Sequence, residues 1–433
     1  MKELKKYAAI GGAIAIAACW PFATGQIGQS IMTDTIAHYD NPVVSIELLD
    51  YDRGYLSSTA VSKVTITDPV IAEQFRADGL PESLTFNHQI HHGLISIDSV
   101  SHLDVPPELE EFLADMDIKF ESSSQLSGST HIQFTSKAKS IQMPAELESG
   151  IERIDVSRFT LDADIDRDGL NGFSYHLPAL DFVSDLGEKI NLSGFSGEGK
   201  GSSNGAFWVG TNDVYLKEAS ITSGTESGVL KGLSYKNSTS LSEESQPGSD
   251  DQKVSSTNTF KLGLLESGQD KVENARLSVT FSELDYAALK KMFATYNKLQ
   301  ESQDQTVISE LELAINLLVA KGLNLSIDDF GATIMGGEFS SKLDLMLPAG
   351  TPRASQDATK LVANLRGSSS VSISKSLAEN NPIVQLMLDE QLEKGVVVDS
   401  GEQYEFTTEI KEGSATLSNG EQVPLFMVLA PFM

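Results

Sequence analysis

The chain has 433 residues, 40% of them hydrophobic and 21% charged, so it holds enough apolar material for a folded core and is not a wholly disordered protein. Its 32 Lys and Arg against 61 Asp and Glu give a net charge of −29, which argues against nucleic acid or anionic lipid headgroups as the main partner. A single cysteine excludes an internal disulfide and a zinc site built from cysteines.

The N-terminus has the pattern of a secretory signal or a signal anchor. Lys2, Lys5 and Lys6 precede an uncharged, mostly apolar stretch over residues 7–23, and this order of a charged and an apolar segment directs export. By the positive-inside rule the lysines stay in the cytoplasm. The pattern therefore predicts that everything after Thr24 lies beyond the membrane.

Three fates of this segment, residues 1–25, are open. As a retained helix, residues 7–23 reach about 26 Å, just short of a hydrocarbon core of about 30 Å. Alternatively, Ile16-Ala17-Ala18-Cys19 reads as a lipobox, which would leave Cys19 as a lipidated N-terminus. The third fate is cleavage to a soluble form. The bulky Trp-Pro-Phe at 20–22 is unlike a lipoprotein start, so the retained anchor is favoured over the lipoprotein.

Beyond the anchor, apolar and polar residues alternate with a period of two, which is typical of half-buried strands. Strands over 43–51 and 55–68 are expected around Asp52-Arg53-Gly54, and residues 159–166 lead into an Asp-Gly turn at 168–169. We expect further hairpin segments at 84–97, 118–141, 194–210, 214–221 and 229–241, and an exposed loop at 243–254.

Helices interrupt this pattern in the C-terminal half. Ser282-Glu283-Leu284-Asp285 predicts a helix start, residues 306–321 form an apolar helical stretch before Gly322, and Asn381-Pro382 predicts a third start. Strands are expected at 323–329, 337–347, 404–410 and 415–417, followed by an Asn-Gly turn at 419–420.

The predicted fold class is α+β and predominantly antiparallel β, a long β-meander or curved sheet with a few helices in its C-terminal half and an N-terminal anchor helix. At about 150 residues per domain the chain could form two or three units. We expect a β-rich part over 26–275 and an α+β part over 276–433 that continues the same sheet.

Several loose motifs, in this order, resemble one known family, the YdgA-type proteins of Gram-negative bacteria, also called the domain of unknown function 945 (DUF945) family. The motifs are Tyr51-Asp52-Arg53-Gly54-Tyr55-Leu56-Ser57-Ser58, then Asn87 with His92 and Gly93, the turn at 166–169, Tyr296 with Asn297, and Asn419-Gly420. The first motif is also similar to the start of AsmA-like proteins, which build long β-grooves at the envelope.

The resemblance implies an inner-membrane protein whose bulk faces the periplasm. It supplies no catalytic or cofactor-binding residues. Tyr51, Arg53, Gly54, Ser57 and Ser58 are therefore singled out as motif residues without an assigned role. Arg53 itself is interpreted as an ion-pair partner of Asp50 or Asp52, with a ligand contact as the alternative.

Two groups of residues invite a metal interpretation, and neither supports it. Asp164, Asp166 and Asp168 resemble the start of an EF-hand loop, but Tyr175 stands where such a loop needs a bidentate Glu. His88 and His92 would share one strand face about 13 Å apart, with His91 on the other. We expect a solvated strand face, and surface or satisfied histidines near a turn, with no metal and no cofactor.

The apolar helix at 307–320 is predicted to be buried in the core or to cover an apolar groove. No phosphate loop, nucleophile elbow or HExxH motif occurs in the sequence. We therefore expect a non-enzymatic envelope protein that contacts the inner membrane through its N-terminal segment, and that either acts as a scaffold or binds lipid in an apolar groove. The alternatives are a recognition module whose acidic surface and loop at 243–254 bind a basic protein, and an envelope hydrolase.

Overall fold

The computed structural model describes residues 43–54, 57–77, 79–92, 96–125, 128–143, 150–166, 169–203, 207–243, 251–301, 305–350 and 358–425. The chain divides into two compact units, the first ending at Ser202 and the second beginning at Ser203. The boundary expected at 275/276 falls inside a strand of the second unit. The predicted anchor at 1–25, with Cys19, lies outside the described residues.

The first unit is an antiparallel sheet in which most strands pair with their neighbours in the sequence. The order is β1-β2-β3-β4-β5-β6-β9-β10-β11, and the β7–β8 hairpin joins it through β8 and β10. The bounds are β1 (Val44–Arg53), β2 (Ser57–Ile66), β3 (Ser83–His92), β4 (Ser96–Asp104), β5 (Lys119–Gln125), β6 (Thr130–Ser136), β7 (Lys139–Gln142), β8 (Ile151–Val156), β9 (Phe159–Asp166), β10 (Gly169–Ser184) and β11 (Lys189–Ser203).

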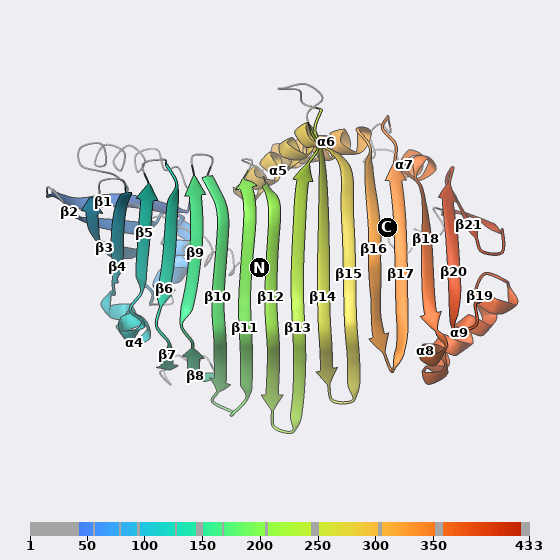
Figure 1. Cartoon of the computed structure of the whole chain (residues 1–433), viewed down its shortest axis with the longest axis horizontal. Helices are drawn as coiled ribbons and strands as arrows, with labels where there is room; N and C mark the ends of the chain where they lie inside the picture. The colour runs from blue at the N-terminus through green and yellow to red at the C-terminus, as the bar shows by residue number, and fades with distance from the viewer. Residues whose placement is uncertain are drawn as a thin grey trace. The chain divides into compact units, whose positions relative to one another are not determined.

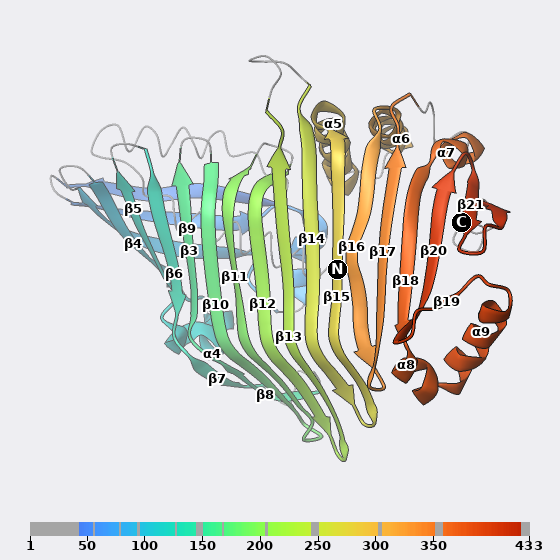
Figure 2. The ribbon, with the colours of Figure 1, turned by 45° about the vertical axis from the view of Figure 1, so that its right-hand side comes forward.

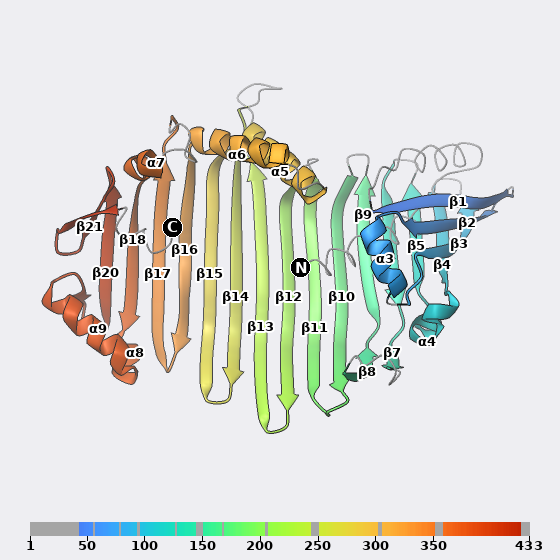
Figure 3. The same cartoon turned by 180° about the vertical axis from the view of Figure 1, so that it is seen from behind.

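The sheet of the first unit curls back on itself. Strands β1 to β3 turn across the strands that follow, and helix α3 (Pro69–Ala77) lies on the inner side of the curl (Figures 1 and 3). Asp68 begins this helix, because its carboxylate accepts hydrogen bonds from the backbone N–H of Val70 (2.8 Å) and Ile71 (3.0 Å). A second short helical segment follows β4, with η1 (Pro107–Leu109), α4 (Glu110–Leu113) and η2 (Ala114–Met116).

The second unit is also an antiparallel meander. Its strands follow the order β12-β13-β14-β15-β16-β17-β18-β20-β21-β22, and β19 pairs with β20. The strand bounds are β12 (Trp208–Ser223), β13 (Glu226–Leu241), β14 (Lys253–Ser267), β15 (Asp270–Asp285), β16 (Leu323–Ile334), β17 (Gly337–Leu347), β18 (Arg366–Ser374), β19 (Val398–Asp399), β20 (Gln403–Lys411), β21 (Ser414–Leu417) and β22 (Gln422–Pro424). The predicted antiparallel meander is confirmed.

Some predicted hairpins have different limits. Residues 214–221 and 229–241 are the two arms of one hairpin, β12–β13. Residues 194–203 form the second half of β11 and residues 208–210 the start of β12, and residues 204–206 between them lie outside the described residues. The predicted loop at 243–254 is shorter, since β14 already begins at Lys253, and residues 244–250 lie outside the described residues.

One face of the strands in the second unit is apolar and partly open to solvent. Tyr235, Phe260, Leu277 and Phe330 lie opposite one another in successive strands. Phe260 and Phe330 remain 44% and 43% exposed, so the row is not fully covered. The alternate positions carry polar groups, such as Thr259 and Ser278, whose hydroxyls lie 3.3 Å apart.

The long strands bend near their hairpin ends (Figure 2). The alternation of apolar and polar residues along these strands is interrupted at one line across them. Gly232 and Asn274 have φ values of 65° and 52°, and a Cβ on Gly232 would lie 3.6 Å from the backbone nitrogen of Gly263. At this line the apolar residues are spaced by three positions instead of two, as in Leu230 to Leu233. Aligned irregularities of this kind keep apolar side chains on one face through a bend.

Helices lie near the ends of the strands of the second unit (Figures 1 and 3). These are α5 (Tyr286–Glu301), α6 (Gln305–Ala320), α7 (Ala358–Asn364), α8 (Lys375–Asn380) and α9 (Pro382–Glu393). The predicted start of the first helix is wrong by one turn. Ser282 still belongs to β15, and Asp285 caps α5 by accepting from the backbone N–H of Ala288 at 3.0 Å. The predicted Asn381 cap of α9 is confirmed, since its side chain accepts from Ile383 and Val384.

Helix α6 has the predicted extent and ends before Gly322, whose φ is 85°. It is buried along one stripe, as at Ala314 and Leu318, whereas Leu313 is 65% exposed. The prediction that the helix at 307–320 is buried in the core is therefore wrong for part of its surface. Within the described ranges, no helix combines the length and the apolar character that crossing a membrane requires.

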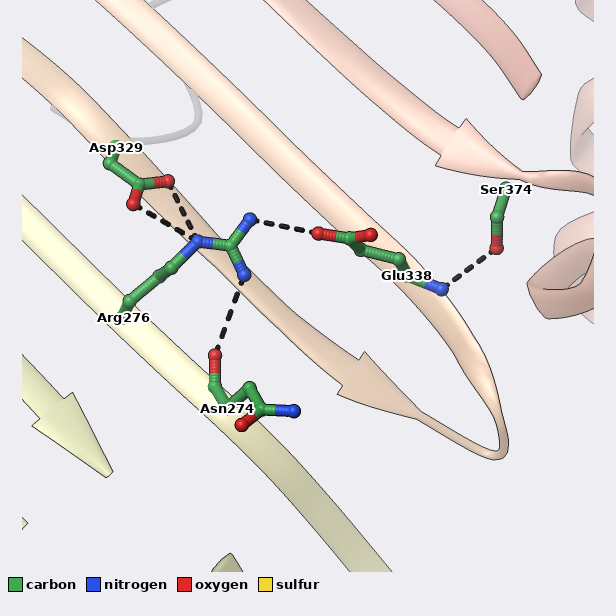
Figure 4. A network of polar contacts seen from close by, with 5 residues as sticks. All are labelled: Asn274, Arg276, Asp329, Glu338 and Ser374. Atoms are coloured by element: carbon green, nitrogen blue, oxygen red, sulfur yellow. Dashed lines mark hydrogen bonds and ion pairs between the residues drawn. The ribbon is translucent and has the colours of Figure 1, made fainter. Parts of the chain in front are cut away.

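Arg276 joins three neighbouring strands beside the bend (Figure 4). Its Nε donates to both carboxylate oxygens of Asp329 at 2.9 and 3.0 Å, and its Nη2 donates to Glu338 at 2.9 Å. The backbone N–H of Glu338 in turn donates to Ser374 at 2.7 Å. The hydrogen bond to Glu338, together with the nearby Asp329, raises the pKa of Arg276 above its ordinary value.

We predict that Arg276→Met lowers the free energy of unfolding of the second unit by about 2 kcal/mol, because charge-assisted hydrogen bonds on both carboxylates are lost. Arg276→Lys should recover less than half, since an ammonium cannot fork between two carboxylates. Urea denaturation measures both values. Equal stability of the Met variant and the parent protein would show that the network does not stabilise the bend.

Candidate functional site

The first unit contains an apolar cavity of about 540 Å³. It lies inside the curl, so strands as distant in sequence as β1 and β9 line it together with α3 and the helical segment after β4. Its lining residues are Val44, Val64, Ile66, Phe75, Leu80, Pro81, Glu82, Ser83, Leu84, Leu103, Leu109, Leu113, Ile118, Phe120, Ile132, Phe134, Phe159 and Leu161. Its volume is in the range of sites that hold small molecules.

Strand alternation explains why the cavity is apolar. In β2 and β3, the even-numbered residues are directed inward and buried, as at Val64 and Phe86. Aromatic rings from β3, β5, β6 and β9 continue this surface, with centroid separations of 5.9 Å for Phe86–Phe120, 4.7 Å for Phe120–Phe134 and 5.5 Å for Phe134–Phe159. These contacts hold the wall of the cavity in place without polar groups.

A buried polar layer lies beside the apolar one. His88 is 1% exposed, and its two ring nitrogens lie 2.8 Å from the hydroxyls of Ser62 and Ser101. In the neutral ring one nitrogen donates and the other accepts, so both hydroxyls are satisfied. Burial lowers the pKa of His88 from 6.5 to about 4, because a charged imidazolium would lose its hydration there.

The two N-terminal motifs meet in this region. The Ser58 hydroxyl lies 2.9 Å from Nε2 of His92, and Tyr51 packs against the buried cluster of Ala60, Ile90 and Ile97. Position 54 requires glycine, because a Cβ there would collide with the carbonyl oxygen of Ser57. Gly93 lies outside the described residues.

None of the described residues of these two motifs lines the cavity. Arg53 and Ser57 are exposed at the ends of β1 and β2. Within the described residues no ion pair joins Arg53 to Asp50 or Asp52, so the expected pairing is not observed. The histidine prediction is confirmed: His88 and His92 share the inner face, and His91 is exposed.

The aspartates of β9 bind neighbouring side chains. Asp162 accepts from Gln133 at 2.7 Å, Asp164 lies 2.9 Å from Nδ1 of His131, and Asp166 accepts from Asn171 at 2.7 Å. The expected strand face thus carries cross-strand contacts and is still open to solvent at Asp164, whose side chain is 63% exposed. Asp168 lies outside the described residues, and no group of three or more potential metal-binding side chains was found within them.

The comparison with protein families decides what kind of chain this is. A family model described as a bacterial protein of unknown function, DUF945, matches residues 4–426. The chain belongs to the DUF945 family. No curated protein and no solved structure matches this DUF945 protein. The further links to YdgA-type and AsmA-like proteins stay predictions.

Sequence reasoning missed the cavity because it missed the segments that close it. Helix α3 supplies Phe75, and the helical turns after β4 supply Leu109 and Leu113. Asp68-Pro69 and Pro106-Pro107 were the available signals, since an Asp cap or a proline in the first turn favours a helix start. Both segments are short, and they lack the repeated apolar spacing that identified the longer helices.

We predict a pH-dependent stability that arises from His88. Its folded pKa of about 4 lies below its unfolded value of 6.5, so its contribution is fully present above pH 6.5 and is lost as the pH falls through 4. The wild-type protein should lose about 3 kcal/mol more than His88→Asn between pH 7 and pH 4. Urea denaturation at the two pH values measures this difference.

His91→Asn is the matched control, because this neighbour is exposed and should keep the pH dependence of the parent protein. An identical loss of stability in the wild-type protein and in His88→Asn would show that His88 is not held neutral by burial.

Proposed function

We propose that this bacterial DUF945 protein is a non-enzymatic envelope protein that holds the hydrocarbon chain of a lipid in the cavity of its first unit. The observation that carries the proposal is the lining of the cavity of about 540 Å³, in which Glu82 and Ser83 are the polar residues among otherwise apolar side chains. A hydrocarbon chain needs no polar partner, so such a site leaves no motif in the sequence.

The energetics favour an apolar ligand over water in this space. Water is stable in a buried cavity when polar groups offer it several hydrogen bonds, and an apolar wall offers none. Each methylene group transferred from water to such a wall contributes about 0.8 kcal/mol. Phe134 and Leu161 lie opposite each other on β6 and β9 and supply part of this wall.

We also propose that the N-terminal segment anchors the protein in the inner membrane, with the folded units in the periplasm. The support is the sequence pattern of lysines followed by the apolar stretch at 7–23. A periplasmic protein held at the membrane surface would have direct access to lipids. The alternative mode of attachment, lipidation at Cys19, serves the same location.

The cavity predicts a dependence of affinity on chain length. Binding of straight-chain alkanols, measured by calorimetry, should tighten about 4-fold per added methylene group until the cavity is filled. Leu161→Trp places a larger side chain into the cavity and should shorten the longest chain accepted. Leu49→Trp is the control, because Leu49 is 49% exposed on β1 and does not line the cavity.

Native mass spectrometry of protein purified from membranes gives an independent measurement. We expect a lipid adduct on the wild-type protein and on Leu49→Trp, and its loss from Leu161→Trp. Adducts of equal abundance on all three proteins would place the lipid elsewhere, and their absence together with no alkanol binding would reject the proposed function.

Localisation is tested separately. A reporter enzyme that is active only outside the cytoplasm, fused to the C-terminus, should be active, and replacement of Lys2, Lys5 and Lys6 by Glu should reduce its activity. A reporter active only in the cytoplasm would overturn the proposed location. Cys19→Ser separates the two modes, since it abolishes membrane attachment if lipidation is the anchor and leaves it intact if the helix is.

A further inference from the structure

The cavity of the first unit has one polar edge. Glu82 and Ser83 are adjacent in the chain, and among the described lining residues they are the polar ones. They precede Leu84 and follow Pro81, both of which line the apolar wall. The side chain of Glu82 is 35% exposed, so this edge reaches solvent. A ligand with an apolar tail and a polar head would therefore direct its head toward Glu82 and Ser83.

Arg76 lies at the same edge. It belongs to the last turn of α3, next to the lining residue Phe75, and its Nε and Nη2 each lie 2.7 Å from Oε1 of Glu82. The Arg76 side chain is 67% exposed, so it lies further out than Glu82. Glu82 is thus the member of the pair that lines the cavity, and the guanidinium of Arg76 lies beside it at the same edge.

The geometry of the pair leaves donors on the guanidinium. An arginine carries five N–H groups, and the contacts with Glu82 use two of them. The planar fork matches a carboxylate through paired hydrogen bonds. The carboxylate of Glu82 is meanwhile neutralised by its partner, so it does not oppose a second anion as a free charge would. The remaining N–H groups of the guanidinium are therefore the donors that an anionic head would use at this edge.

We propose that the ligand is a free long-chain carboxylate, whose tail fills the cavity and whose carboxylate binds Arg76. This inference rests on the proposed function and adds the chemical class of the head. Arg76 is the binding residue. Glu82 is a positioning residue, because it holds the guanidinium beside the cavity.

The test compares three probes that share a twelve-carbon chain and differ in the head: dodecanoate, dodecanol and dodecyltrimethylammonium. The full-length protein in nanodiscs of uncharged lipid is titrated by calorimetry at pH 8, with empty nanodiscs as the blank. We expect dodecanoate to bind roughly 5-fold more tightly than dodecanol, as a partly exposed charge-assisted contact gives. The cationic probe should bind more weakly than both.

Arg76→Gln should remove the preference, so that dodecanoate binding weakens roughly 5-fold while dodecanol binding changes less than 2-fold. Glu82→Gln should weaken dodecanoate binding less than Arg76→Gln does. Arg158→Gln is the matched control, because Arg158 is exposed in the same unit and does not line the cavity. The dodecanol measurement also shows that each variant retains a folded cavity.

The outcomes separate the two proposals. Equal binding of dodecanoate and dodecanol, or a preference that survives in Arg76→Gln, overturns the carboxylate assignment and leaves the hydrocarbon site standing. Tighter binding of the cationic probe also overturns it and assigns the head contact to Glu82. Absence of binding by all three probes overturns the proposed function itself.

Discussion

The fold of each unit depends on the alternation of side chains along antiparallel strands. Successive residues point to opposite faces, so each sheet has one apolar and one polar side. The apolar side is stable only when other side chains or a ligand cover it and exclude water. In the first unit, the curl brings β1 and β2 toward β9, so that Val44 and Leu161 line one common cavity. The hydrophobic effect thus favours closure of the curl, and the side chains inside the curl leave the cavity unfilled.

Polar groups sit within this unit where they are fully satisfied. His88, Ser62 and Ser101 are buried and bonded to one another, and the hydroxyls of Ser99 and Ser122 pair at 2.8 Å. In the described residues, no buried side-chain nitrogen or oxygen lacks a partner. A layer of this kind specifies the register of neighbouring strands, because a shift by one residue would separate every pair. The hydroxyl of the motif residue Ser58 likewise lies 2.9 Å from Nε2 of His92.

Membership of the DUF945 family establishes a bacterial protein and leaves its function to physical argument. The cavity is the strongest feature for that argument, since its size and lining suit a hydrocarbon chain. The second unit leaves part of its apolar face exposed to solvent. Its long strands bend at Gly232 and Asn274, and Arg276 links β15, β16 and β17 close to this line. Phe260 and Phe330 stay partly exposed on its apolar face.

The sequence by itself determined the strands, most of the turns and the longer helices, because these depend on local spacing. The alternation at 159–166, the cap at Asn381 and the glycine after α6 act within a few residues of the chain. It also predicted that His88 and His92 share one face, since side chains two or four positions apart on a strand point to the same side. The tertiary structure alone decided the cavity, the pairing of Ser62 and Ser101 with His88, and the Arg76–Glu82 edge. These features require the curl of a sheet and the closure by α3, which arise from packing between residues far apart in the chain and leave no periodic signal.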